Sequence, residues 1–76
     1  MALTPKEREY YSTMAADAAK DLSHITRHAP AQTHEEFIEQ VAHVRAHGNS
    51  EAQALADWCL ARWTHAHDEL GMPVGA

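Results

Sequence analysis

The sequence feature that most constrains the fold is the stretch of residues 50–71, in which small or apolar residues recur in steps of four and three. At about 100° per residue, such positions fall on one face of an α-helix. The pattern predicts an amphipathic helix over residues 51–70. The residues of its apolar face are Ala52, Ala56, Cys59, Trp63, Ala66 and Leu70.

Start and stop signals bound this helix. Ser50 and Gln53 have the spacing of a capping box, in which a hydroxyl accepts a hydrogen bond from a backbone N–H and the amide reaches back to the cap. Gly71 favours the left-handed conformation that ends many helices, and Pro73 cannot continue one. We therefore expect Ser50 to cap the helix and Gly71 to end it.

The two tryptophans of this helix differ in position. Trp63 belongs to the apolar face and is expected in the core. Trp58 lies about 100° away from Cys59, with Arg62 one turn further on. It is either a boundary residue on which Arg62 stacks, or an anchor for a partner, since Trp and Arg are enriched at interface hot spots.

A long helix is predicted near the N-terminus. Thr4, Pro5 and Glu7 suit the N-cap, N1 and N3 positions of a helix that runs over residues 5–28. Pro30 disfavours helical geometry in the residue before it. The apolar positions of this helix are Tyr11, Ala15, Ala18, Leu22, Ile25 and Ala29. The small residues among them predict a close approach of another helix near residues 15–19.

A shorter helix is predicted between these two. Thr33 and Glu36 form a second capping-box pair, and Gly48 suits the end of a helix over residues 34–47. Its apolar face contains Phe37, Ile38, Val41 and Val44.

These segments predict an all-α fold: a single helical domain over residues 1–76, built as an up-down-up bundle of a long, a short and a long helix, with a tail at 72–76. Short connectors join antiparallel neighbours. The first helix would measure about 36 Å and the second about 20 Å, so Tyr10 and Tyr11 should overhang the second helix. An aromatic overhang favours pairing with another chain, and a two-fold homodimer is the commonest solution.

Composition argues against several classes of function. The net charge is −5 and the six Lys and Arg residues are scattered, which argues against a nucleic-acid binder. No apolar run approaches the length of a membrane span, and the first residues lack the order of a signal peptide, so the cytoplasm is the expected location. Cys59 lies in the apolar stripe and the serines have no triad context, so we expect no enzymatic activity.

Histidine is over-represented, with seven residues in 76. Most of them fall in the last two turns of a predicted helix, where an imidazolium interacts favourably with the helix dipole. Seven added protons would take the net charge from −5 to +2, so mild acid should change the surface charge strongly. An up-down-up bundle would also gather His24, His28 and His65 at one end, where they could bind Zn²⁺ or Ni²⁺.

The sequence thus favours a small acidic protein-interaction module: an inhibitor, adaptor or assembly factor, of the kind that phages and mobile elements often encode. It would bind another protein, without a cofactor, through an aromatic helical surface. The expected contact residues are Tyr10, Tyr11, Trp58 and Arg62, with Asp17 and Asp21 as a polar rim. The alternative is a metal-binding or metal-responsive protein that uses the histidine cluster.

Overall fold

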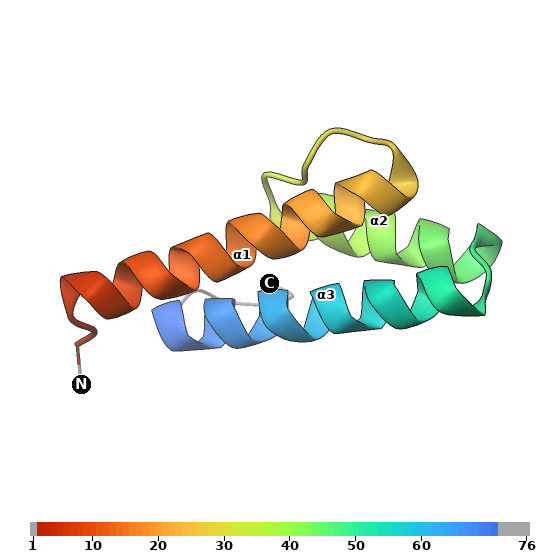
Figure 1. Ribbon diagram of the computed structural model, residues 1–76. Helices are drawn as coiled ribbons and strands as arrows, with labels where there is room; N and C mark the ends of the chain where they lie inside the picture. Colours follow the sequence, from red (N-terminus) through yellow and green to blue (C-terminus); the bar gives the residue numbers. More distant parts are fainter. Residues whose placement is uncertain (1, 72–76) are drawn as a thin grey trace.

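The computed structural model describes residues 2–71, which form three α-helices and no strand (Figure 1). Helix α1 spans Pro5–Thr26, α2 spans His34–His47 and α3 spans Ser50–Leu70. The predicted all-α fold is confirmed, while the tail predicted at 72–76 lies outside the described residues.

Side-chain caps begin the first two helices. At α1 the capping box is complete: Thr4 Oγ1 accepts from Glu7 N, and Glu7 Oε1 accepts from Thr4 N, both at 3.1 Å. At α2, Thr33 Oγ1 accepts from Glu36 N at 3.1 Å, but the Glu36 carboxylate accepts from Gln32 N rather than from Thr33 N. Only half of the second predicted box therefore forms.

The start of α3 lies one residue earlier than predicted. Asn49 is the N-cap, because its side-chain oxygen accepts from Ala52 N at 2.8 Å. Ser50 is the first helical residue, and Gln53 Nε2 donates to Gly48 O at 3.0 Å. The predicted Ser50–Gln53 capping box is therefore wrong, since the amide of Asn49 occupies the capping position.

The first helix ends earlier than predicted, at Thr26 instead of residue 28. Arg27 adopts the left-handed conformation, with φ 62° and ψ 26°, and its N–H donates to Ser23 O at 2.7 Å. The Thr26 hydroxyl then accepts from His28 N at 3.3 Å. These local bonds stop the helix and lengthen the connector to residues 27–33.

The longer connector decides the direction of α2. Gln40 Nε2 donates to Ala29 O at 3.0 Å, and the rings of His28 and His43 lie 6.0 Å apart, so the connector begins beside the second half of α2 and runs back along it. Helix α2 therefore runs in the same direction as α1, and α3 is antiparallel to both (Figure 1). Seven extended residues can span up to about 23 Å, close to the length of α2, about 21 Å. This differs from the predicted up-down-up order, which assumed a connector too short to return the chain.

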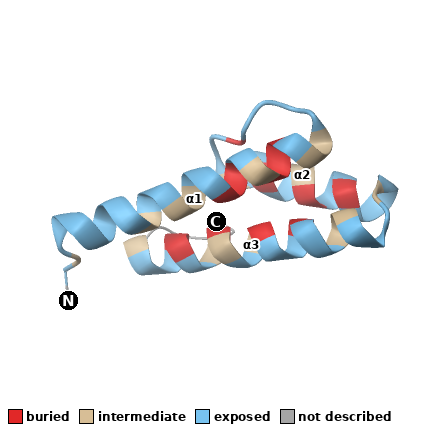
Figure 2. Ribbon diagram, viewed as in Figure 1, coloured by how far each residue is buried: buried red, intermediate tan, exposed pale blue. Residues whose placement is uncertain are grey.

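The core lies where all three helices meet (Figure 2). Trp63 is 5% exposed, as predicted, and Ala18 and Ala19, which belong to the small residues near positions 15–19, are buried in the core. Ile38, predicted on the apolar face of α2, is 40% exposed because it lies about 100° around the helix from buried Phe37. The buried apolar residues of the helices are Ala18, Ala19, Leu22, Phe37, Val41, Val44, Ala56, Cys59, Trp63 and Ala66.

The first turns of α1 extend beyond the start of α2, as the helix lengths predict (Figure 1). No residue of α1 before Ala18 is buried, and Tyr10 is 62% exposed. None of the described helices has the length and apolar character needed to cross a membrane.

Candidate functional site

Arg62 on α3 is the centre of an exposed surface that spans α1 and α3. Its Nη1 donates to Asp21 Oδ2 on α1 at 2.8 Å, and its guanidinium carbon lies 4.2 Å from the centroid of the Trp58 ring. The predicted stacking of Arg62 on Trp58 is confirmed. The stack still leaves Trp58 54% exposed, so the same tryptophan can also serve as an anchor for a partner.

A shallow hollow adjoins this stack. Arg62 lines it together with Tyr10, Thr13, Met14 and Asp17, and its volume is about 250 Å³. The structure thus brings together all of the predicted contact residues except Tyr11. We call this set the aromatic surface; it consists of Tyr10, Thr13, Met14, Asp17, Asp21, Trp58 and Arg62.

Tyr11 adjoins the aromatic surface through its contact with Tyr10. Its ring makes edge contacts with the ring of Tyr10, at 5.1 Å between centroids, and with the ring of His65 on α3, at 5.6 Å. Burial raises the pKa of Tyr11, and the charges of Glu69 and Glu7 raise it further. Tyr11 therefore joins α1 to α3 and supports the ring of Tyr10.

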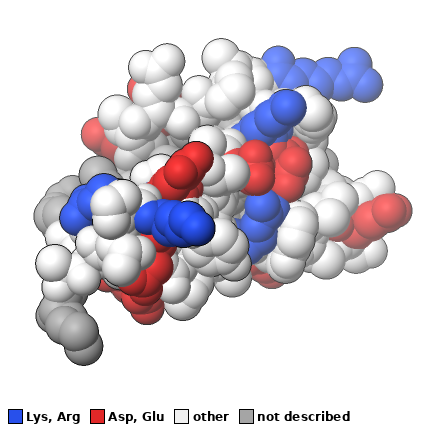
Figure 3. Space-filling view, turned by 60° about the vertical axis from the view of Figure 1, so that its left-hand side comes forward, with Lys and Arg blue, Asp and Glu red and all other residues white. Residues whose placement is uncertain are grey.

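Three residues in or next to this surface were not predicted from the sequence. Met14 and Thr13 line the hollow, and Leu55, one turn before Trp58 on α3, is 45% exposed. The spacing of three residues between Leu55 and Trp58 places both on one side of α3, and this spacing could have indicated that Leu55 lies next to the aromatic surface. Figure 3 shows acidic and basic side chains interspersed on the face in view, without a large patch of one sign.

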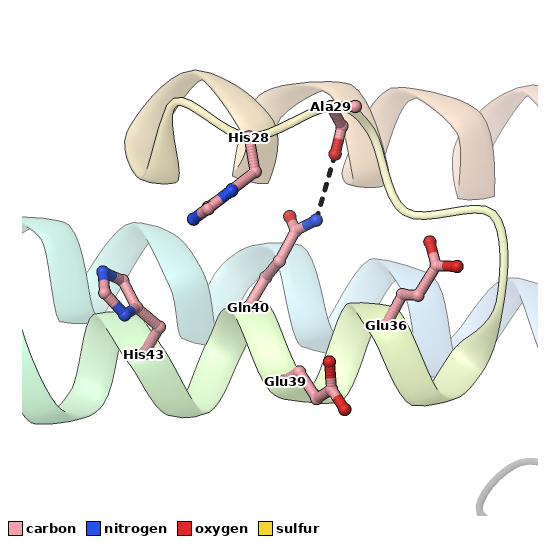
Figure 4. A pocket seen from close by; sticks show the side chains of 6 residues that line it. All are labelled: His28, Ala29, Glu36, Glu39, Gln40 and His43. Atoms are coloured by element: carbon pink, nitrogen blue, oxygen red, sulfur yellow. Dashed lines mark hydrogen bonds between the residues drawn. The ribbon is translucent and has the colours of Figure 1, made fainter.

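The predicted metal ligands are dispersed. His65 on α3 packs on Tyr11 of α1. Tyr11 is thirteen residues, or about 20 Å, from His24 along α1, so His65 and His24 lie far apart. His28 instead faces His43 across a hollow that Ala29, Glu36, Glu39 and Gln40 also line (Figure 4). Within residues 2–71 no three His, Cys, Asp or Glu side chains are placed so that they could hold a metal ion. The physical reason is that α3 runs antiparallel to α1, so that their C-terminal ends lie far apart.

The only cysteine is a core residue. Cys59 is 1% exposed. Burial raises the pKa of its thiol, the charge of Asp21 adds to this effect, and Arg62 opposes it. The thiol is therefore protonated near neutral pH and poorly suited to act as a nucleophile.

Comparisons of the chain with models of protein families, with curated proteins and with solved structures found no match. Any inference about function therefore depends on the geometry of the residues described above.

Proposed function

We propose that this protein is a small, non-catalytic interaction module that binds another protein through the aromatic surface. The observation that carries the proposal is the state of Trp58: the side chain is more than half exposed and yet is held by Arg62, which Asp21 fixes in turn. A large aromatic ring that is ordered before binding loses little conformational entropy when a partner covers it.

The chemistry of the surface suits a protein partner. Trp, Tyr and Arg are the residue types most enriched at interface hot spots, and the hollow beside Arg62 can receive a side chain of the partner. The acidic net charge, and the interspersed acidic and basic side chains on the face seen in Figure 3, argue against a nucleic-acid partner. A cytoplasmic inhibitor, adaptor or assembly factor would need only such a surface.

The partner can include a second copy of this chain. The part of α1 before Ala18 has no buried residue, Tyr10 in it is 62% exposed, and the first turns of α1 extend beyond the start of α2 (Figure 1). A two-fold homodimer would cover this overhang with the same surface of the other copy.

The test compares the wild type with Trp58→Ala and Tyr10→Ala by sedimentation velocity. We expect the wild type to associate and each variant to associate at least about tenfold more weakly, because truncating a hot-spot side chain costs about 2 kcal/mol or more and about 1.4 kcal/mol corresponds to a tenfold change in affinity. Ile38→Ala is the matched control, since Ile38 is an exposed apolar residue on α2, outside the aromatic surface. All variants should keep the helical circular dichroism of the wild type.

A second measurement covers a partner other than a copy of this chain. A photo-crosslinking amino acid at position 55, where exposed Leu55 lies one turn before Trp58, should capture one discrete protein in the native host, and the same probe at position 38 should not. Equal association of all variants, together with identical crosslinks from both positions, would contradict the proposal.

A further inference from the structure

Trp63 is the residue that attaches the start of α2 to α3. Its indole stacks on the ring of Phe37, with 4.4 Å between centroids and 10° between planes, and Nε1 donates to Nδ1 of His34 at 3.0 Å. The ring of His67, one turn further along α3, lies 4.3 Å from the same indole. Two side chains from the first turn of α2 therefore depend on one indole of α3.

The hydrogen bond defines which ring nitrogen of His34 is the acceptor. An indole N–H can only donate, so Nδ1 of His34 must carry a lone pair and the proton of the neutral ring must be on Nε2. A second proton would have to bind at Nδ1, where two N–H groups would then face each other. The bond would be lost, and the N–H of Trp63, whose side chain is buried, would have no acceptor.

His67 is an imidazole whose charged form is disfavoured by its surroundings. The side chain is 9% exposed, and its Nδ1 is buried without a hydrogen-bond partner among the described residues. Burial lowers the pKa of His67, the neighbouring His34 lowers it further, and Asp68 opposes these effects. Since the two imidazole rings are 6.3 Å apart, a charge on one disfavours a charge on the other.

The surroundings offer little compensation for a charge at this position. From α3, the charge of Asp68 raises the pKa of His67. Arg62 on α3 and Asp21 on α1 form an ion pair, so their opposite charges offset each other. From α2, the titratable group that acts on His67 is His34. The core residues that α1 contributes cannot carry charge; they are Ala15, Ala18, Ala19, Leu22 and Ile25.

We propose that His34, Trp63 and His67 form a pH-sensitive latch that releases the first turns of α2 from α3 on mild acidification. Contacts that do not involve the latch residues, such as Asp21 with Arg62 and Tyr11 with His65, keep α1 and α3 together. Release would expose the apolar faces of Phe37 and Trp63, which the closed form buries. The device is separate from the aromatic surface and does not depend on the proposed function.

The experiment uses the full chain with Trp58→Phe, so that Trp63 is the only tryptophan. Trp63 fluorescence and the hydrogen-exchange protection of residues 37–41 are followed from pH 7.5 to pH 5.0, with protection corrected for intrinsic exchange. We expect a red shift of the emission and a loss of protection of at least about tenfold over this range, since each proton taken up on opening changes the equilibrium by up to about tenfold per pH unit.

Two variants remove the titration but keep the contacts. In His34→Gln an amide oxygen can still accept from the indole, and in His67→Phe a ring can still stack on it. Each should reduce the pH response and the double variant should abolish it, whereas His24→Gln, at an exposed position on α1, should behave as the wild type.

Two results would overturn the proposal. One is a wild-type response that is flat from pH 7.5 to 5.0, or that persists unchanged in the double variant. The other is a ¹⁵N spectrum at pH 7.5 in which neutral His34 carries its proton on Nδ1. If His67→Phe lowers the helical signal at pH 7.5, the proposal is tested by comparing the pH response of His34→Gln with that of the wild type and by the tautomer measurement.

Discussion

At the scale of single residues, Gly48 shows how closely α2 and α3 approach each other where they join. A Cβ atom at this position would lie 2.7 Å from Val44 O, 3.0 Å from Val44 Cγ1 and 3.1 Å from Ala52 Cβ. The nearest atom belongs to the backbone, and the same carbonyl accepts the N–H of Gly48. Glycine is therefore needed here for space, because its φ of −83° is open to any residue.

We predict that Gly48→Ala lowers the free energy of unfolding by about 1–3 kcal/mol, the usual cost of overpacking. Urea denaturation followed by circular dichroism measures it. Gly71→Asn is the control: Gly71 has a φ of 73°, which asparagine tolerates, and a Cβ there meets no atom within 4 Å. Equal stability of Gly48→Ala and the wild type would show that the junction is looser than described.

At the scale of helices, the start of α3 gives a direct test of the capping assignment. Asn49 supplies the capping oxygen, whereas Ser50 is already helical and exposed. Asn49→Ala should therefore cost about 1 kcal/mol of stability, and Ser50→Ala should change it by less than about 0.5 kcal/mol. The reverse order in urea denaturation would restore the cap expected from the sequence.

The helices themselves could be predicted because their signals are local. Caps such as Thr4 and Thr33, and the spacing of three and four between apolar residues, depend on neighbours within one or two turns. The end of α1 carried no such signal: Arg27 takes the left-handed position that usually belongs to glycine or asparagine. A shift of two residues there lengthened the connector enough to change the direction of α2.

That change affected the two candidate sites differently. The metal site was inferred from the helix directions, so His24 and His65 separated once α1 and α3 proved antiparallel. The aromatic surface was inferred from residue chemistry, and it persists because Arg62 reaches Asp21 from the opposite helix. The latch of His34, Trp63 and His67 could not be predicted, because its members meet only through the observed course of α2.

At the scale of the whole molecule, the helices form an elongated body of 40 × 22 × 20 Å. Helix α2 covers only part of the α1–α3 pair, and the buried residues gather in the region where it lies (Figure 2). The first turns of α1 therefore add exposed surface and little core. A chain of this size has a total stability of about 4–11 kcal/mol, so a few titrating groups can change it appreciably.

Two buried groups give opposite pH limits to that stability. His67 has its pKa lowered below the ordinary 6.5, so the unfolded chain binds a proton that the folded chain does not, and stability falls as the pH drops below about 6.5. Cys59 has its pKa raised above the ordinary 9.0, so the unfolded chain loses a proton that the folded chain keeps, and stability falls as the pH rises above about 9. Tyr11, with its pKa raised above 10.0, acts in the same direction at higher pH.

We therefore predict a stability maximum at about pH 7–8.5, with slopes on either side of up to about 1.4 kcal/mol per pH unit for each of the two buried groups. Urea denaturation at intervals from pH 5 to pH 10 measures the curve. Cys59→Ala should flatten the fall in stability above pH 9 and leave the fall on the acid side unchanged. His67→Phe should flatten the fall on the acid side and leave the fall above pH 9 unchanged. A stability that rises between pH 9 and 10, or an acid limb that both variants share with the wild type, would show that other groups control the pH dependence. Cys59 and His67 lie on the same face of α3 with Trp63 between them. The prediction therefore assigns both the acid and the alkaline limit of stability to a single helix.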